Sequence, residues 1–290
     1  MQSTDTLDPV QLAQDLMRID STSGREGEVI AYADRFLAAR GWTTRRIPVS
    51  EGRDDLLATS DDAPLVTFST HLDTVPPFIP PRLDGDRLYG RGACDAKGIA
   101  AAMVCAAERL RADGIAVALL FVVGEETTHD GADAANVSPL APSSSRVLIN
   151  GEPTESTLAL GTKGALRVVV RTAGRAAHSA YPELGHSATR DLVRLLFDLD
   201  DVELPRDELL GETTVNIGRL AGGVADNVVA PSAEARLMAR LVSPVEETLE
   251  RLRAWVGDRA TVEVGEIVPA VRLTPLPGYP TSVVAFATDV

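Results

Sequence analysis

Three apolar runs of strand length in the first half of the chain each end in a histidine or a carboxylate. The runs cover residues 65–70, 117–124 and 146–151, and they are followed by His71, Glu125 and Glu152. In an open α/β sheet, ligands bind outside the carboxyl ends of the strands. If the runs are strands of one such sheet, their polar residues share one crevice. This feature favours an α/β fold with a functional site at one sheet edge.

The first half of the chain alternates between helix and strand patterns. Helices are expected from Pro9, where Asp8 can cap the first turn, over 26–40 before Gly41, and over 97–112. Strands are expected near 43–48, 54–59, 64–70, 116–123 and 146–150. This alternation predicts an α/β domain with a mixed, mostly parallel sheet and helices on both faces.

The pattern changes after Gly164. The expected elements there follow the order βαββαβ, over 165–173, 184–199, 211–219, 233–242, 244–256 and 261–267. This order is typical of a ferredoxin-like α+β unit, which leaves an edge strand open. We therefore predict a catalytic domain over 1–163, an inserted ferredoxin-like lid domain over 164–268, and a return to the first domain over 269–290.

The composition argues against several classes of protein. The 290 residues, 44% of them hydrophobic, supply a core for each of two domains. No apolar run approaches the roughly 20 residues of a membrane span, and the N-terminus lacks the features of a signal peptide. A net charge of −14 argues against nucleic acid and anionic membranes as partners. Cys94 and Cys105 are too few for a disulfide framework, so we expect a cytoplasmic protein.

The residue types at the strand ends suit a metal ion. In an extended chain His71 and Asp73 point to one face, so the carboxylate can accept the proton of the imidazole nitrogen that does not bind metal. Asp95 lies among three glycines before the helix at 97–112, where it can be a ligand, a helix cap or both. Imidazole and carboxylates without paired cysteines favour a hydrolytic zinc, cobalt or manganese site. The alternative for His71 is an ordinary turn histidine.

Glu125 and Glu126 strengthen the metal interpretation. Two adjacent carboxylates that close a buried strand repel each other unless a cation is near, and they point in different directions. One can bind metal while the other acts as a base toward water. The alternative is a solvated strand end. Taken together, the features predict a metal-dependent hydrolase.

Four strings of the sequence carry a resemblance to a known family. They are STHLDTVP (69–76), GRGACDAKG (90–98), GEE (124–126) and GEPT (151–154). They resemble the acetylornithine deacetylase, succinyl-diaminopimelate desuccinylase and aminoacylase family of dinuclear zinc amidohydrolases, and the resemblance covers nearly the whole chain. It implies a metal-binding catalytic domain with an inserted lid that also serves dimerisation.

The resemblance implies two Zn²⁺ ions, with Co²⁺ or Mn²⁺ as alternatives. The implied ligands are His71 and Glu152 for one ion, Glu126 for the other, and Asp95 as the bridge. Glu125 would be the general base, and Asp73 would orient His71. The peptide bond after the bridging aspartate is cis in that family, which here is Asp95–Ala96.

The inserted domain carries three further matches. His178 resembles a lid histidine that reaches the active site of the partner subunit and stabilises the oxyanion, which implies a homodimer. Asn227 and Arg240 resemble residues that hold the amide surroundings and the α-carboxylate of the substrate. An arginine suits a carboxylate because it can donate two parallel hydrogen bonds. His178 could equally be a turn histidine, and Arg240 a solvated strand end.

The end of the chain departs from the family. The family supplies a last histidine to the metal held by Glu126, whereas no histidine follows His186 here. We therefore expect 269–290 to be incomplete and the second metal site to be weak. The first expected function is removal of the acyl group from an N-acyl amino acid such as acetylornithine. A dipeptidase or carboxypeptidase on the same fold, and a dimeric binding protein without turnover, are the alternatives.

Overall fold

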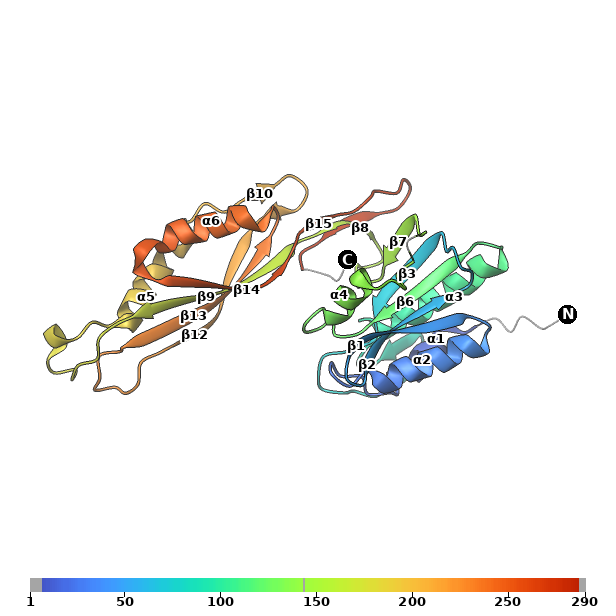
Figure 1. Cartoon of the computed structure of the whole chain (residues 1–290), viewed down its shortest axis with the longest axis horizontal. Coiled ribbons are helices and arrows are strands. Elements are labelled where there is room, and N and C mark those ends of the chain that lie inside the picture. The colour runs from blue at the N-terminus through green and yellow to red at the C-terminus, as the bar shows by residue number, and fades with distance from the viewer. Residues whose placement is uncertain (1–6, 143, 287–290) are drawn as a thin grey trace. The chain divides into compact units, whose positions relative to one another are not determined.

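The N-terminal unit is built on a five-stranded mixed sheet (Figure 1). The computed structural model describes residues 7–142 and 144–286, and these divide into two units, one up to residue 155 and one from residue 156 onward. The elements of the first unit are α1 (Pro9–Met17), α2 (Gly27–Ala39), β1 (Thr43–Ser50), β2 (Arg53–Thr59), β3 (Val66–His71), β4 (Arg82–Asp84), β5 (Arg87–Tyr89), α3 (Lys97–Ala112), β6 (Val117–Val122), α4 (Asp130–Val137) and β7 (Val147–Asn150).

The strand order of this sheet is β1-β2-β6-β3-β7. β3 pairs in parallel with both β6 and β7, whereas β2 pairs antiparallel with β1 and β6. The predicted mixed sheet is therefore confirmed, with its parallel part at β6, β3 and β7. Strands β4 and β5 form a separate hairpin.

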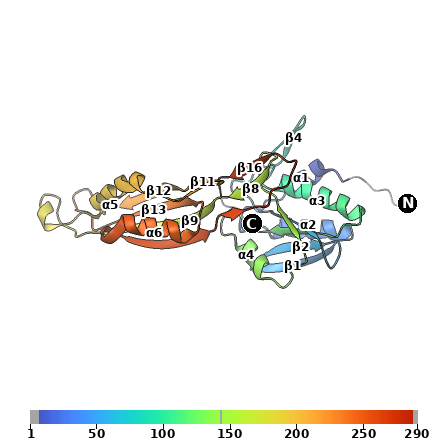
Figure 2. The same cartoon turned by 90° about the horizontal axis from the view of Figure 1, so that it is seen from above.

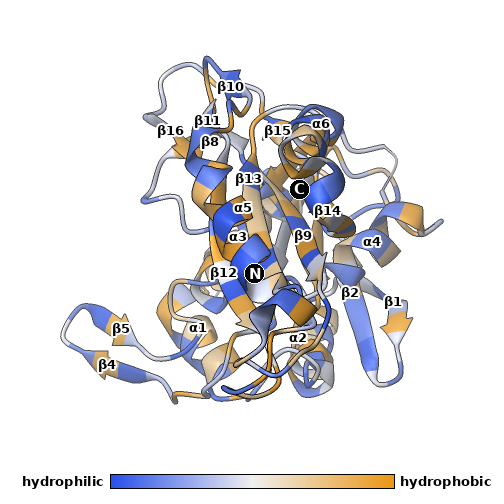
Figure 3. Cartoon of the chain, turned by 90° about the vertical axis from the view of Figure 1, so that its left-hand side faces the viewer, coloured by the Kyte–Doolittle hydropathy of each residue, from blue (hydrophilic) through white to orange (hydrophobic). Residues whose placement is uncertain are grey.

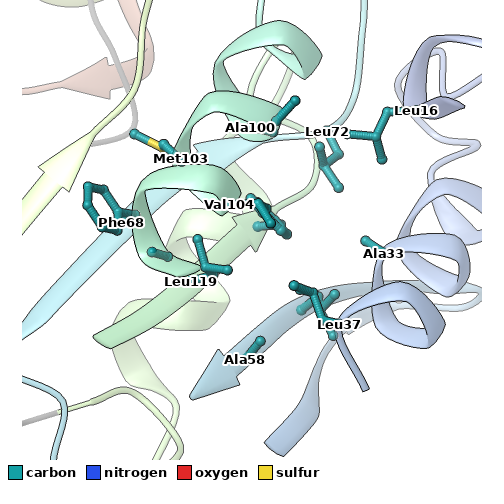
Figure 4. Close-up of a cluster of buried hydrophobic side chains, with 14 of the residues drawn as sticks. Leu16, Ala33, Leu37, Ala58, Phe68, Leu72, Ala100, Met103, Val104 and Leu119 are labelled. Atoms are coloured by element: carbon teal, nitrogen blue, oxygen red, sulfur yellow. The ribbon is translucent and has the colours of Figure 1, made fainter. Parts of the chain in front are cut away.

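Helices cover both faces of the sheet, as predicted. α1, α2 and α3 pack on β2, β3 and β6 on one face. The apolar side chains buried between these helices and strands include Leu16, Leu37, Phe68, Val104 and Leu119 (Figure 4). α4 covers the other face through a smaller cluster of Ile47, Leu57, Ala118 and Ala135. The sequence did not predict α4, because it is short and combines a glycine with few apolar residues.

Local signals explain the helix ends. Oδ1 of Asp8 accepts a hydrogen bond from the amide of Val10 at 2.9 Å, and Pro9 occupies the first turn of α1. α2 stops before Gly41, whose φ of +83° is the left-handed conformation that glycine adopts without strain. Both features were predicted from the sequence.

The second unit contains the predicted βαββαβ order. Its elements are β8 (Leu158–Thr162), β9 (Gly164–Ala173), α5 (Ala188–Phe197), β10 (Arg206–Asp207), β11 (Gly211–Glu212), β12 (Thr214–Gly222), β13 (Ser232–Leu241), α6 (Val245–Val256), β14 (Thr261–Val268), β15 (Val271–Arg272) and β16 (Thr281–Val284), with short 3-10 helices at Pro182–Leu184, Asp198–Asp201 and Gly257–Arg259. The helix expected over 184–199 is shorter, because it begins after the extended residue Ser187, whose hydroxyl caps it, and gives way to a 3-10 helix at Asp198.

The four-stranded sheet of this unit has the order β12-β13-β9-β14 with antiparallel pairs throughout. α5 and α6 cover one face of it and share one apolar core with its strands (Figure 2). Hydrophilic and hydrophobic residues are interleaved along α6 (Figure 3). The ferredoxin-like arrangement is thus the observed one.

A third, smaller sheet was not predicted. β15 and β16 both pair with β8, antiparallel and parallel respectively. The proposed limits of 1–163, 164–268 and 269–290 stay a prediction. Within the described ranges, no helix has the length and apolar character needed to cross a membrane.

Candidate active site

The polar residues that follow β3, β6 and β7 lie at one edge of the first sheet. Because β3 is parallel to both neighbours, the three strands end at the same edge (Figure 1). His71 is the last residue of β3, and Glu125 and Glu152 follow β6 and β7 within three residues. The sheet therefore positions these side chains as the spacing of the runs predicted.

Three of the four expected metal ligands form one cluster. Ligand atoms of His71, Asp95 and Glu152 all lie within 4.8 Å of one another. His71 is fully buried, whereas the side chain of Asp95 is 46% exposed. One imidazole and two carboxylates are a donor set that suits a hydrolytic zinc ion with a position open for water or substrate. These residues therefore fit the metal that the sequence predicts.

Asp95 reaches the cluster from the loop before α3. The helix begins after Ala96 and has no side-chain cap, so the cap interpretation of Asp95 does not apply. The Asp95–Ala96 peptide bond is cis, as the family resemblance implied. Asp95 is therefore a side chain of the cluster and not part of the helix end.

The imidazole of His71 has a defined orientation. Its Nδ1 lies 3.0 Å from the carbonyl oxygen of Asp73 and 3.3 Å from Oδ1 of the same residue. Since a carbonyl oxygen can only accept a hydrogen bond, Nδ1 carries a proton and donates it. Nε2 then faces Oδ1 of Asp95 at 2.9 Å. The orientation leaves Nε2 as the ring atom that can bind a metal.

The charges of the cluster favour a cation. Burial lowers the pKa of the His71 imidazole, but the carboxylates of Asp73, Asp95 and Glu125 raise that pKa by more. Burial raises the pKa of Asp73, but its hydrogen bonds to His71 and Ser23 lower that pKa below its ordinary value. Groups that stabilise a proton on the imidazole also stabilise a metal cation at the same place.

Glu125 and Glu126 occupy different positions relative to the cluster. The side chain of Glu125 is 12% exposed, and its Oε2 lies 4.0 Å from Nε2 of His71. Among the described residues, neither glutamate belongs to the group of three candidate ligands. Burial raises the pKa of Glu126, and the charge of Asp95 raises it further, so Glu126 interacts electrostatically with the cluster. A second metal bound by Glu126 stays a prediction.

The expected residues of the second unit lie at two places. His178 and Asn227 are exposed on adjoining loops, where His178 forms an isolated bridge with Val228 and the amide of Ser179 donates to the carbonyl of Asn227 at 2.9 Å. Arg240 lies near the C-terminal end of β13, where it pairs with Thr214 of β12 and Ala165 of β9. Within this unit, the structure brings His178 and Asn227 together and places Arg240 apart from them.

Two residues that contact the site region were missed from the sequence. The hydroxyl of Ser23 donates to Oδ2 of Asp73 at 2.7 Å. Lys97, which is 1% exposed, donates from Nζ to the carbonyl oxygens of Leu16 and Ile19. Serines after a helix and a lysine in the first turn of a helix are ordinary surface patterns, so no local signal marked them. The burial of a lysine is the structural observation that singles it out.

Comparison with known proteins places the chain in a family. Residues 160–264 match the peptidase dimerisation domain, M20_dimer. A peptidase M20 domain-containing protein of Schizosaccharomyces pombe is 37% identical over 297 residues, which covers 97% of this chain and 72% of that protein. The chain belongs to the M20 peptidase family. A probable carboxypeptidase of Aspergillus fumigatus is 38% identical to this chain over 323 residues, covering 96% of the chain and 73% of the relative.

Solved structures share the fold of this M20 family member. A tripeptidase from Staphylococcus aureus has a TM-score of 0.79 at 20% identity, covering 98% of this chain and 86% of that one. An M20 family metallo-carboxypeptidase from Sulfolobus solfataricus has a TM-score of 0.72 at 17% identity, covering 97% and 86%. The predicted family and the fold class, a catalytic domain with an inserted dimerisation domain, are therefore confirmed. Membership in a family of peptidases and amidohydrolases also agrees with the predicted class of hydrolase.

Proposed function

We propose that this chain hydrolyses the amide bond formed by the amino group of an amino acid whose α-carboxylate is free. The observation that carries the proposal is the cluster of His71, Asp95 and Glu152 with the carboxylate of Glu125 beside it, 4.0 Å from Nε2 of His71. A metal site with a carboxylate beside it, placed to accept a proton from water, is what water-activating hydrolysis requires. The first candidate is the last peptide bond of a short peptide, because relatives are named as probable carboxypeptidases. The bond of an N-acyl amino acid is the second.

A zinc ion held by the cluster, or two ions with Glu126 holding the second, would polarise the scissile carbonyl and lower the pKa of a water molecule. Cobalt or manganese could serve in the same role. Asp73 accepts a hydrogen bond from Nδ1 of His71 and so keeps Nε2 available as a ligand. Glu125 takes a proton from water as the water oxygen bonds to the carbonyl carbon, and it donates that proton to the amide nitrogen as the C–N bond breaks. The products are a carboxylic acid and a free amino acid.

We assign substrate contacts to the second unit. Arg240 would bind the α-carboxylate and Asn227 the region of the amide. His178 would oppose the charge on the tetrahedral oxygen, supplied across a homodimer interface. The dimer is supported by the match of residues 160–264 to the peptidase dimerisation domain. The cytoplasm remains the expected location.

The decisive experiment separates the proposed base from the metal ligands. Glu125→Gln keeps the size of the side chain but cannot accept a proton as a carboxylate does. We expect it to retain the zinc content of the unaltered protein while kcat falls by roughly 10²–10⁴. Turnover of dipeptides and N-acetyl amino acids, measured beside zinc content by elemental analysis, is the readout. Loss of zinc, or unchanged turnover, would remove Glu125 from this role.

The same assay distinguishes the candidate functions. A carboxypeptidase or dipeptidase should favour unblocked dipeptides over N-acetyl amino acids in kcat/KM, and a deacylase should show the reverse order. Removal of zinc with a chelator should abolish either activity, and added zinc should restore it. Zinc binding without turnover of either substrate class would favour the non-catalytic binding protein.

A further inference from the structure

The segment between α1 and α2 is attached to the stretch that carries His71 and Asp73. The hydroxyl of Ser21 donates to the carbonyl of Leu72 at 2.6 Å, in a fully buried contact. The amide of Thr74 donates to the carbonyl of Ser21 at 3.0 Å, and the amide of Ser23 donates to the carbonyl of Thr74 at 3.1 Å. Backbone and side-chain hydrogen bonds therefore hold the segment on both sides of Asp73.

Ser23 reaches the carboxylate of Asp73 itself. Its hydroxyl lies 2.7 Å from Oδ2. The same carboxylate accepts hydrogen bonds from the amides of Glu125 and Glu126, at 3.1 and 3.2 Å. The side chain of Asp73 is inaccessible to solvent, so protein groups take the place of water around it. Of these three donors, two are backbone amides and one, from Ser23, is a side-chain hydroxyl. Ser23 lies 50 residues before Asp73 in the chain.

The same segment is tied to the loop that carries Asp95. Nζ of Lys97 donates to the carbonyl oxygens of Ile19 at 2.8 Å and Leu16 at 3.1 Å. Lys97 is buried and stands two residues after Asp95 in the chain. The segment from Ile19 to Ser23 therefore contacts both stretches that supply ligands to the cluster, one through Ser23 and the other through Lys97.

We propose that Ser23 is a positioning residue for the metal centre. By donating to Oδ2 of Asp73, it fixes the rotation of that carboxylate together with the amides of Glu125 and Glu126. Oδ1 then faces Nδ1 of His71, and Nε2 is directed at the cluster. This inference rests on the proposed metal-dependent function but concerns metal binding, which can be measured without a substrate. Substituting a residue that orients the metal ligands by hydrogen bonding, without binding the metal itself, typically weakens metal affinity by about 10–100-fold.

The test uses three variants and zinc alone as the probe. Ser23→Ala removes the hydroxyl, and Ser23→Thr keeps it. Ser21→Ala removes a hydroxyl of the same segment that donates to the backbone carbonyl of Leu72. Calorimetric titration with zinc should show affinity about 10–100-fold weaker for Ser23→Ala and within about threefold of the unaltered chain for Ser23→Thr. Ser21→Ala should lower Tm at least as much as Ser23→Ala, because its contact is more buried, yet keep zinc affinity within about threefold.

Other outcomes would overturn the proposal. Unchanged zinc affinity in Ser23→Ala would show that the hydroxyl does not position the ligand. Equal weakening in Ser21→Ala and Ser23→Ala would show that the segment acts only through stability, and failure of Ser23→Thr to restore affinity would contradict the hydroxyl's role. A chain that binds zinc but hydrolyses nothing would contradict the proposed function, whereas the comparison of serine variants would still decide the role of Ser23.

Discussion

At the residue scale, the site is a buried imidazole surrounded by carboxylates. The Nε2 atom of His71 has Oδ1 of Asp95 at 2.9 Å and Oε2 of Glu125 at 4.0 Å. Asp95 and Glu125 have different roles in the proposed mechanism although both are acidic. Asp95 belongs to the group of three candidate ligands, whereas Glu125 lies beside that group. Single substitutions can therefore separate metal binding from proton transfer.

Asp95→Ala should lose metal and activity together. The substitution removes one of three candidate metal ligands. Zinc affinity should therefore fall by more than about 100-fold, which is the upper range for substituting a residue that only contacts a ligand. Zinc titration is the measurement, and Asp84→Ala, which removes a carboxylate that is 64% exposed in the β4–β5 hairpin, is the matched control. If Asp95→Ala binds zinc as tightly as the control, Asp95 is not a ligand.

At the scale of elements, an ion-pair network joins β2 to the starts of two helices. Arg53 of β2 donates to Glu26, the residue before α2, at 3.0 and 3.1 Å, and to Asp130, the first residue of α4, at 2.6 and 3.1 Å. Gly124 lies against this network, and a Cβ there would stand 2.6 Å from Nη2 of Arg53. The network therefore supports the turn that carries Glu125.

Arg53→Met should destabilise the N-terminal unit by about 3–5 kcal/mol, because it leaves the fully buried Glu26 without its ionic partner. The free energy of unfolding in urea is the measurement. Arg46→Met is the control, since Arg46 is 35% exposed in its pairs with Asp34 and Asp54 and should cost about 1 kcal/mol or less. Equal losses in both variants would contradict a special role for Arg53.

The same variant should change the response to acid. Hydrogen bonds from Arg53 are the largest cause that lowers the pKa of Asp130. A carboxyl with a lowered folded-state pKa stabilises the fold above its ordinary pKa of about 3.9, and this contribution disappears as the pH falls through the folded-state value. The stability difference between the unaltered chain and Arg53→Met should therefore shrink below about pH 4. A difference that is constant from pH 7 to pH 3 would contradict this linkage.

At the scale of the whole molecule, the second unit has two unlike sheet edges. Strand β14 carries glutamates paired with arginines of β9, an arrangement that discourages further pairing. Strand β12 instead exposes Ile217 and Leu220, and α5 of the same unit exposes Val193 and Phe197, the last at 83%. We assign the proposed homodimer contact to β12 and α5, because a second copy would cover these apolar side chains.

Charges on this surface should separate the subunits. Phe197→Glu combined with Leu220→Lys should shift sedimentation from dimer to monomer, because both charges would be buried in the interface. Val137→Glu is the control, since Val137 is 84% exposed in α4 of the other unit. A dimer that survives the double substitution would place the contact on another surface.

A mixture of inactive variants tests whether His178 acts across the dimer. His178→Ala and Glu125→Gln should each be nearly inactive, yet a mixed dimer would carry one site with an intact base and an intact histidine from the partner subunit. We expect partial recovery of turnover after subunit exchange. No recovery despite demonstrated exchange would place His178 within its own subunit's site or outside catalysis.

The sequence by itself determined the elements whose signals are local. The start of α1 depends on Asp8 and Pro9, and the βαββαβ order of the second unit follows from periodic burial, so both were predicted. The position of His71, Glu125 and Glu152 at the ends of apolar runs also predicted that these residues lie close together, because the carboxyl ends of parallel strands lie at the same edge of the sheet. Short elements such as α4, β15 and β16 were missed because they contain too few residues to show a period.

Only the tertiary structure decided which distant groups support the site. Ser23 and Asp73 are 50 residues apart in the chain, and Lys97 and Ile19 are 78 apart. The sheet edge brought Glu152 into the cluster with His71 and Asp95 but left Glu126 outside that group. The physical reason is that a hydrogen bond or ligand contact needs its atoms within about 3 Å. Packing of helices on the sheet sets such distances between residues far apart in the chain, whereas periodicity describes only the local backbone.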